Sequence, residues 1–351
     1  MSFADELKSV RLRKTQPPSN VSNNEPLLCP DSETYRKLMD DTQFERYYRS
    51  IERWTFPSVI VPLNAEEIKA LHEGHHAFKN SSEQDDDRKT EACFQLFPVL
   101  LTLSKTIDDC DLKRPIFVRL STRSPKDAGL LLNRDRLKEI CRARYECLGE
   151  HGVAQHNLTE DNRRRMAIDE ASIRLLAVND GFHAVQLLLA SQRIQDDLQC
   201  SSLLNLIIRE FLIDDRRYPS EFRAFIYRRQ FTALTQYNEF VFYPTLHERK
   251  DAILRSIERF FHNENLLQEI PFENCALDLL LIEQSIDDYR VYICEINPLA
   301  EFAGAGLFSW LNDRDILLGR QPFQFRINEK DPTPNQTFQM NNDWFSLIDQ
   351  I

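Results

Sequence analysis

The chain has 351 residues, of which 42% are hydrophobic, and its formal net charge is −11. A chain of this length can bury a core without disulfides or metal staples, as one large domain or two joined lobes. The acidic charge disfavours binding to a nucleic acid backbone. No apolar run approaches the ~20 residues that span a bilayer. The start of the chain also lacks the apolar stretch of a secretory signal, so we expect a cytoplasmic protein with no membrane or nucleic acid partner.

Cysteine and glycine usage excludes several common sites. The eight cysteines are scattered and form no C-x-x-C pair, which is typical of reduced, buried thiols. Only eight glycines occur, and the glycine-based nucleotide motifs G-x-x-x-x-G-K-[ST] and G-x-G-x-x-G are both missing from the sequence. A nucleotide would therefore have to be held by side chains and a metal ion.

The two ends of the chain differ in composition from the middle. Residues 1–30 contain the linker-like stretch QPPSNVSNN, and residues 331–351 form a turn-rich tail. We therefore expect a flexible N-terminal segment, a folded body over residues 31–330 and a C-terminal tail.

Runs of β-branched and aromatic residues predict strands in a mixed α/β (α+β) body. In chain order the expected strands are Ser58–Pro62, Pro115–Leu120, Asn205–Leu212, Glu221–Arg228, Gln230–Gln236, Cys275–Glu283 and Tyr289–Glu295. Short connections predict that the fourth and fifth strands form one hairpin, and the sixth and seventh another.

Helices are predicted by apolar residues at helical spacing. The stretches Phe182–Leu198 and Lys250–Asn263 both show such a stripe. Thr159, followed by Glu160 and Asp161, is a favourable helix start, because a hydroxyl caps backbone N–H groups and acids suit the positive end of the helix dipole.

Three oxygen donors fall on the last two expected strands. Glu295 and Asn297 are two residues apart, so they point to the same face, and Asp278 lies among apolar residues on the neighbouring strand. A buried carboxylate is costly unless it is paired or binds a cation. These donors suit Mg²⁺, which prefers a few protein oxygens together with phosphates and water. The alternative is three solvated polar residues at strand ends.

Three arginines interrupt apolar strands: Arg119, Arg209 and Arg223. The planar, permanently charged guanidinium matches phosphate oxygens. The alternative is that each arginine pairs with a carboxylate. Available carboxylates are those of Glu210, Glu221 and Asp278.

A zinc-protease motif, H-E-x-x-H, occurs at His72–His76. Gly74 weakens a helix there, and a charged loop begins near Asn80. We therefore interpret the motif as an exposed helix end.

Several segments, taken together and in order, resemble the cell division cycle protein 123 family over about residues 43–312. The segments that carry the resemblance are Thr55–Leu63, Pro115–Asp127 (PIFVRLSTRSPKD), Ile207–Phe211, Glu221–Phe225, Leu234–Gln236, Asp278, Glu295–Pro298 (EINP) and Leu307–Trp310. The resemblance implies a two-lobed ATP-grasp-like fold with mostly antiparallel sheets. Its lobes would be about residues 43–200 and 201–330, with ATP between them.

The resemblance also implies roles for individual residues. Asp278, Glu295 and Asn297 would bind Mg²⁺, and Arg119 and Arg223 would lie near the phosphates. Arg209, Glu210 and Phe211 would form the adenine side. The implied function is assembly of translation initiation factor 2, in which the protein would contact the gamma subunit and join it to the alpha subunit.

Three positions depart from the family pattern. Arg119 stands where the family usually has lysine, Glu295 where it has aspartate, and Tyr237 where it has arginine. Glutamate at 295 is closer to ATP-grasp ligases, so an ATP-grasp ligase or kinase acting on a protein or small molecule remains an alternative. No catalytic residue is assigned.

Residues 3–15 (FADELKSVRLRKT) resemble a WASP-homology-2 actin-binding motif, a short amphipathic helix followed by a basic segment. This resemblance implies actin as a second partner, and an actin-binding adaptor as a further alternative. A disordered, mildly basic tail is the simpler interpretation.

Overall fold

The computed structural model describes residues 32–330, with gaps at 84, 133, 152–157, 201–203, 213–220 and 264. Both predicted end segments, including the actin-binding candidate at residues 3–15, lie outside the described residues. No described helix is long and apolar enough to cross a membrane.

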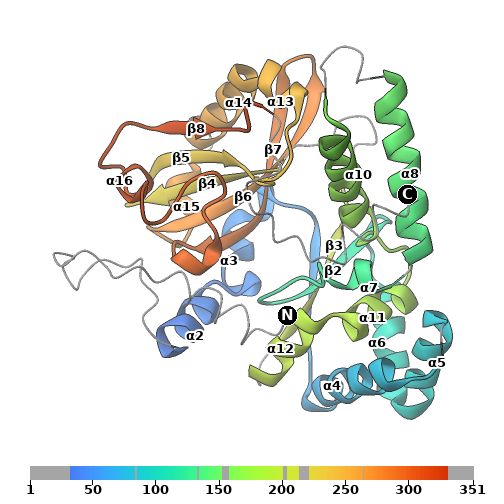
Figure 1. Cartoon of the computed structure of the whole chain (residues 1–351). Coiled ribbons are helices and arrows are strands. Elements are labelled where there is room, and N and C mark those ends of the chain that lie inside the picture. Colours follow the sequence, from blue (N-terminus) through green and yellow to red (C-terminus); the bar gives the residue numbers. More distant parts are fainter. Residues whose placement is uncertain are drawn as a thin grey trace.

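Two β-sheets form the framework of the body (Figure 1). The three-stranded sheet has the order β1-β3-β2 and is antiparallel: β1 (Ser58–Pro62), β3 (Asn205–Glu210), β2 (Ile116–Leu120). The five-stranded sheet has the order β7-β6-β4-β5-β8: β7 (Asp288–Pro298), β6 (Cys275–Ser285), β4 (Glu221–Tyr227), β5 (Gln230–Gln236), β8 (Gln324–Arg326). All its pairs are antiparallel except β5 with β8. The predicted mixed α/β fold with mostly antiparallel sheets is confirmed.

Helices cover one face of the three-stranded sheet. They are α4 (Ala65–Asn80), α5 (Asp86–Leu96), α6 (Pro98–Asp108), α11 (Gly181–Ala190) and α12 (Gln192–Cys200). Side chains alternate along β2, so Ile116, Val118 and Leu120 join the buried cluster under these helices. Phe117 and Arg119 point to the opposite face, toward the second sheet.

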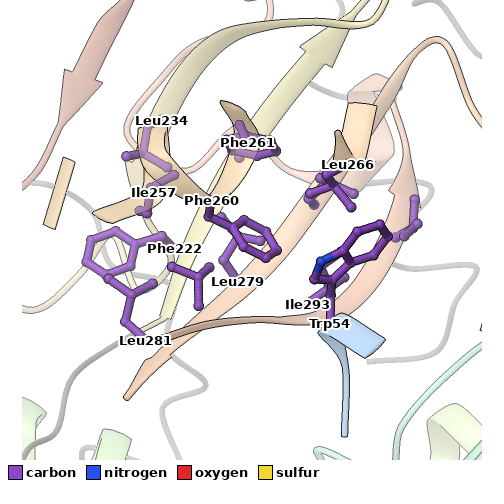
Figure 2. Close-up of a cluster of buried hydrophobic side chains, with 14 of the residues drawn as sticks. Trp54, Phe222, Leu234, Ile257, Phe260, Phe261, Leu266, Leu279, Leu281 and Ile293 are labelled. Carbon is purple, nitrogen blue, oxygen red and sulfur yellow. The ribbon is translucent and has the colours of Figure 1, made fainter. Parts of the chain in front are cut away.

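The five-stranded sheet carries helices on one face and a looped segment on the other. The helices are α13 (Pro244–Glu248), α14 (Lys250–Asn263) and α15 (Leu266–Glu269), and the looped segment contains η2 (Glu301–Ala303) and α16 (Arg314–Leu317). Figure 2 shows part of the core under α14, in which Leu279 and Leu281 of β6 belong to one cluster with Phe260 of α14. Ala276 of β6 lies in the cluster on the other face of the sheet. Because side chains alternate along a strand, Asp278 is on the same face as Ala276 and points away from α14.

The remaining elements are α2 (Ser32–Asp41), α3 (Phe44–Ile51), η1 (Glu52–Trp54), α7 (Ala128–Leu131), α8 (Arg134–His151) and α10 (Glu160–Arg174). Helices α8 and α10 lie side by side at one flank of the molecule (Figure 1) and share a small core of their own around Cys141 and Ile168. Thr159 caps α10 by accepting a hydrogen bond from the N–H of Asn162, as predicted.

Side chains from other elements cover the outer edge of β7. Thr55 donates to the carbonyl of Ile293 at 2.6 Å, and the hydroxyl of Tyr47 accepts from the N–H of Ile296 at 3.2 Å. The backbone of this edge strand is therefore satisfied by side chains over this stretch.

The predicted helix Phe182–Leu198 is wrong as a single element, because α11 ends and α12 begins at Ser191. The backbone of Ser191 is extended, with ψ 123°. Asp127 accepts hydrogen bonds from the Ser191 hydroxyl and from the N–H groups of Gln192 and Arg193. A carboxylate from a distant turn thus caps a new helix inside an apolar run. The sequence reasoning also did not predict β8.

The H-E-x-x-H segment is not a helix end. It lies within α4, where Gly74 is buried against Leu189 and Leu100. His75 is buried as well, and its Nδ1 lies 2.7 Å from the carbonyl of Leu189. Within the described ranges, no group of three His, Cys, Asp or Glu side chains is placed to hold a metal.

Two buried helical glycines provide a test of the packing between α11 and α6. A Cβ at Gly181 would overlap the backbone carbonyl of Ser104, whereas at Gly74 it would meet only side-chain atoms, the ends of Leu189 and Leu100 and, at 3.8 Å, the ring of Phe97. We expect Gly181→Ala to lower the free energy of unfolding by about 3 kcal/mol. Gly74→Ala, the matched control, should change it by less than about 1 kcal/mol. Urea unfolding measures both, and equal effects would contradict the close contact between these helices.

Candidate nucleotide-binding site

A cavity of about 520 Å³ lies where the two sheets face each other. Its walls come from β2 and β3 of the first sheet, β4, β6 and β7 of the second, and α10. Seven of the eight predicted site residues line it: Arg119, Arg209, Glu210, Phe211, Arg223, Asp278 and Glu295. The eighth, Asn297, contacts two of these residues directly.

The three predicted metal ligands converge. Asp278 of β6 is paired in register with Glu295 of β7, next to a bulge that inserts Cys294. The amide nitrogen of Asn297 donates to Asp278 Oδ2 at 2.9 Å and to Glu295 Oε1 at 3.4 Å. Strand pairing therefore brings two carboxylates of the cavity wall together, with the amide of Asn297 in contact with both.

Asp278 forms a buried, bidentate ion pair with Arg223 of β4. Arg223 Nε and Nη2 donate to Asp278 Oδ1 and Oδ2 at 2.7 and 2.9 Å. Arg223 Nη1 donates to the carbonyls of Ala303 and Gly304, so the guanidinium also anchors the looped segment that follows β7. Burial raises the pKa of Asp278, and the ion pair with Arg223 opposes that shift.

Glu295 pairs with Arg119 of β2 across the two sheets. Arg119 Nη1 lies 2.5 Å from Glu295 Oε2, and its other nitrogens donate to the carbonyls of Leu120 and Thr122. Burial disfavours the charge of Glu295, but Arg119 and Lys126 together hold the pKa of this carboxyl well below its usual range. Glu295 is therefore ionised at neutral pH.

Arg209 is engaged by the protein itself. Its guanidinium donates to the side chains of Ser58 and Thr55 and to the carbonyl of Cys294 at 3.2, 2.7 and 2.6 Å. It also lies 4.9 Å from the ring centroid of Phe56. Burial lowers the pKa of Arg209 to about 10. The residue thus joins the three-stranded sheet to the edge of β7 while it lines the cavity.

Glu210 and Phe211 lie at the end of β3, and their backbone N–H groups donate to the carbonyls of Pro57 and Pro115. The Glu210 carboxylate accepts from the N–H of Lys113 at 3.1 Å. Phe211 belongs to an apolar part of the wall, together with Phe56, Phe117, Leu280 and Ile282. This wall offers flat apolar surface to a ring system.

Sequence reasoning missed Lys126, Tyr237 and Glu221 as lining residues. Lys126 belongs to the S-P-K-D turn that helps to carry the family resemblance, and this was the one sign of its role in the sequence. A residue in a turn follows no strand or helix periodicity, so its direction could not be predicted. Its Nζ donates to the Tyr237 hydroxyl at 2.9 Å. Burial opposes the charge of Lys126, but Tyr237, Glu295 and Glu221 together raise its pKa. Lys126 is therefore a cation at neutral pH.

The donor set fits a hard divalent cation. Carboxylate oxygens carry two lone pairs each, so Asp278 Oδ1 and Glu295 Oε2, which each accept one hydrogen bond from an arginine, retain capacity for a ligand bond. Rotation of the Asn297 amide by 180° would present its oxygen, instead of its nitrogen, to a metal ion. The cations around the carboxylates would contact the phosphates that accompany such a metal.

Glu221, which lines the cavity, gives the stability of the protein a pH dependence that can be tested. Burial raises the pKa of Glu221 to about 7, against the opposing effect of Lys126. Between about pH 4.5 and 7, Glu221 keeps its proton in the folded state but loses it in the unfolded state. The protonated carboxyl therefore stabilises the folded state at low pH, and this contribution to the free energy of unfolding is lost as the pH rises through this range. Relative to wild type, Glu221→Gln should gain about 2 kcal/mol in free energy of unfolding from pH 5 to pH 8. Denaturant unfolding at both pH values measures this gain.

The matched control is Glu91→Gln, which alters an exposed carboxyl on α5. Its effect on the free energy of unfolding should not change between pH 5 and pH 8. If Glu221→Gln behaved in the same way as this control, Glu221 would be ionised throughout the range.

Comparison with known proteins identifies the family to which the chain belongs. Residues 153–344, more than half of the chain, match the D123 family. Over 137 residues the chain is 31% identical to the translation initiation factor eIF2 assembly protein of Emericella nidulans. The match covers 38% of this chain and 30% of that protein, so it spans less than a third of the relative's length.

Two solved structures share the fold. Cdc123 from Schizosaccharomyces pombe aligns with a TM-score of 0.55 and 17% identity, over 83% of this chain and 96% of that chain. A C-terminally truncated form of the same protein aligns with a TM-score of 0.54 and 18% identity, over the same shares of the two chains. Because the family match extends over more than half of the sequence and the fold agrees, the chain belongs to the D123 family, as its resemblance to the cell division cycle protein 123 family predicted.

Proposed function

We propose that the protein binds Mg-ATP in the cavity between its sheets and acts as an assembly factor for translation initiation factor 2, joining the gamma subunit to the alpha subunit. The observation that carries the nucleotide part is the pair of carboxylates at Asp278 and Glu295, held on adjacent strands and surrounded by cations. Two buried carboxylates at one point favour a divalent cation with a polyphosphate over an uncharged ligand.

Asp278, Glu295 and Asn297 would hold the magnesium ion. When bound, the ion would neutralise phosphate charge at the acidic end of the cavity. Positive charge near the phosphates would come from Arg119, Lys126 and Arg223. All three residues line the cavity close to the carboxylates. The apolar wall around Phe211 would take the base, with Arg209 and Glu210 at its polar margin.

The assembly part is supported by family membership and by the name of a relative. That relative is named as an eIF2 assembly protein, and the matched stretch is 31% identical to it. A joining role needs bound nucleotide and a protein surface but no transfer of phosphate. ADP release in the absence of a co-substrate would instead favour the alternative of an ATP-grasp enzyme.

Calorimetric titration of Mg-ATP tests the site. We expect wild type to bind and Asp278→Asn to bind at least 30-fold more weakly, a loss of about 2 kcal/mol. The substitution removes a charge that would face the metal and keeps the size of the side chain. No binding by wild type would contradict the proposal.

A control separates lost binding from lost folding. Asp313 forms a similar bidentate pair with Arg326, at 2.8 Å for both contacts, but it does not line the cavity. Asp313→Asn should leave the affinity for Mg-ATP unchanged. Melting temperatures of Asp278→Asn and Asp313→Asn without ligand then show how much stability each protein loses when an Asp–Arg pair is broken.

Reconstitution from purified subunits tests the assembly role. When gamma and alpha subunits of translation initiation factor 2 from the same organism are mixed, adding this protein with Mg-ATP should increase the gamma–alpha complex several-fold, as measured by size-exclusion chromatography. Asp278→Asn should give no increase. Equal complex formation with and without wild-type protein would refute the role in assembly and leave the nucleotide site to be judged by calorimetry.

A further inference from the structure

The cations that line the cavity differ in how far the protein already uses them. Arg119, Arg209 and Arg223 each donate through all three nitrogens to protein oxygens. Lys126, in contrast, donates one hydrogen bond among the described residues, to Tyr237. An ammonium group has three donors, so two of them remain for a ligand.

The Lys126 side chain is exposed to the cavity, where a ligand can reach it. Its charge interacts with Glu295 and Glu221. The amine therefore lies at the acidic end, where phosphates that accompany a metal on Asp278 and Glu295 would lie. A long, flexible lysine gains a defined position there only if something holds it.

Tyr237 supplies that hold. Its hydroxyl accepts the hydrogen bond from Lys126, and the ammonium lies 4.9 Å from the centroid of its ring. The guanidinium of Arg223 lies 5.2 Å from the same ring. One aromatic side chain therefore contacts both the available cation and the arginine that pairs with Asp278, combining a hydrogen bond with two cation–π contacts.

We infer that Tyr237 is a positioning residue that holds the Lys126 ammonium at the acidic end of the cavity, where it contacts the phosphates of the nucleotide. The inference rests on the proposed function for the identity of the ligand. Tyr237 acts through Lys126 and does not itself need to touch the phosphates. Lys126 differs in this respect from the three arginines, whose positions are fixed by carboxylates, hydroxyl groups and backbone carbonyls.

A double-mutant cycle tests this coupling. Tyr237→Phe, which removes the hydroxyl and keeps the ring, should raise the Kd for Mg-ATP about fivefold, the value of one hydrogen bond. In a Lys126→Met background the same change should have no further effect, because the group that Tyr237 positions is gone. A fivefold loss that persists in the Lys126→Met background would overturn the inference, as would an unchanged Kd for Tyr237→Phe alone.

Chemical labelling tests the positioning without a nucleotide. An amine-reactive ester, followed by mass spectrometry, measures how fast Lys126 is modified. Loss of the hydrogen bond should speed the modification of Lys126 about threefold in Tyr237→Phe, since only the neutral amine reacts. The rate at Lys69, on the surface of α4, should stay the same. An unchanged rate at Lys126 would overturn the inference.

The matched control is Tyr289→Phe. Tyr289 also accepts a hydrogen bond from a cation, Arg249 at 3.3 Å, but it does not line the cavity. This variant should match wild type in both assays. If wild type does not bind Mg-ATP, the proposed function fails and so does the phosphate contact of Lys126, whereas the labelling rates still decide whether Tyr237 positions the amine.

Discussion

The bidentate pair between Arg223 and Asp278 is the interaction on which the site depends. It lies on the face of the five-stranded sheet that is turned away from α14, where an unpaired carboxylate would be costly. The same guanidinium binds the carbonyls of Ala303 and Gly304, so it ties two strands and the looped segment together. The charge that suits the cavity for a metal and the contact that shapes its wall thus come from one pair of side chains.

The alternation of side chains along the strands predicted much of the candidate site, whereas helical spacing predicted the helices less accurately. Alternation along β6 and β7 placed Asp278, Glu295 and Asn297 correctly, because register pairing fixes which side chains are neighbours. Lys126 was missed because a turn residue reaches the cavity through tertiary structure alone. The break at Ser191 was missed for the same reason, since the carboxylate that caps α12 belongs to Asp127, far away in the sequence.

The three departures from the family pattern form one connected group in space. Arg119 and Glu295, which replace the family's usual lysine and aspartate, bond to each other at 2.5 Å. Tyr237, where an arginine was expected, contacts Arg223 and Lys126. Arginine in place of lysine thus pairs with glutamate in place of aspartate, and the aromatic side chain of Tyr237 contacts two neighbouring cations. The changes at Arg119 and Glu295 keep the charge of each position, whereas tyrosine at 237 removes one cation from the acidic end of the cavity.

The outer edge of β7 also bears on how the cavity can open. The outward backbone groups of Ile293, Cys294 and Ile296 form hydrogen bonds with the side chains of Thr55, Arg209 and Tyr47, respectively. A further strand therefore cannot add to the sheet along this stretch. Because Arg209 belongs to the other sheet, its contact with Cys294 also fastens the two sheets to each other. Movement of the two sheets relative to each other is therefore restricted at β7, where Arg209 and the ion pair of Arg119 with Glu295 both join them.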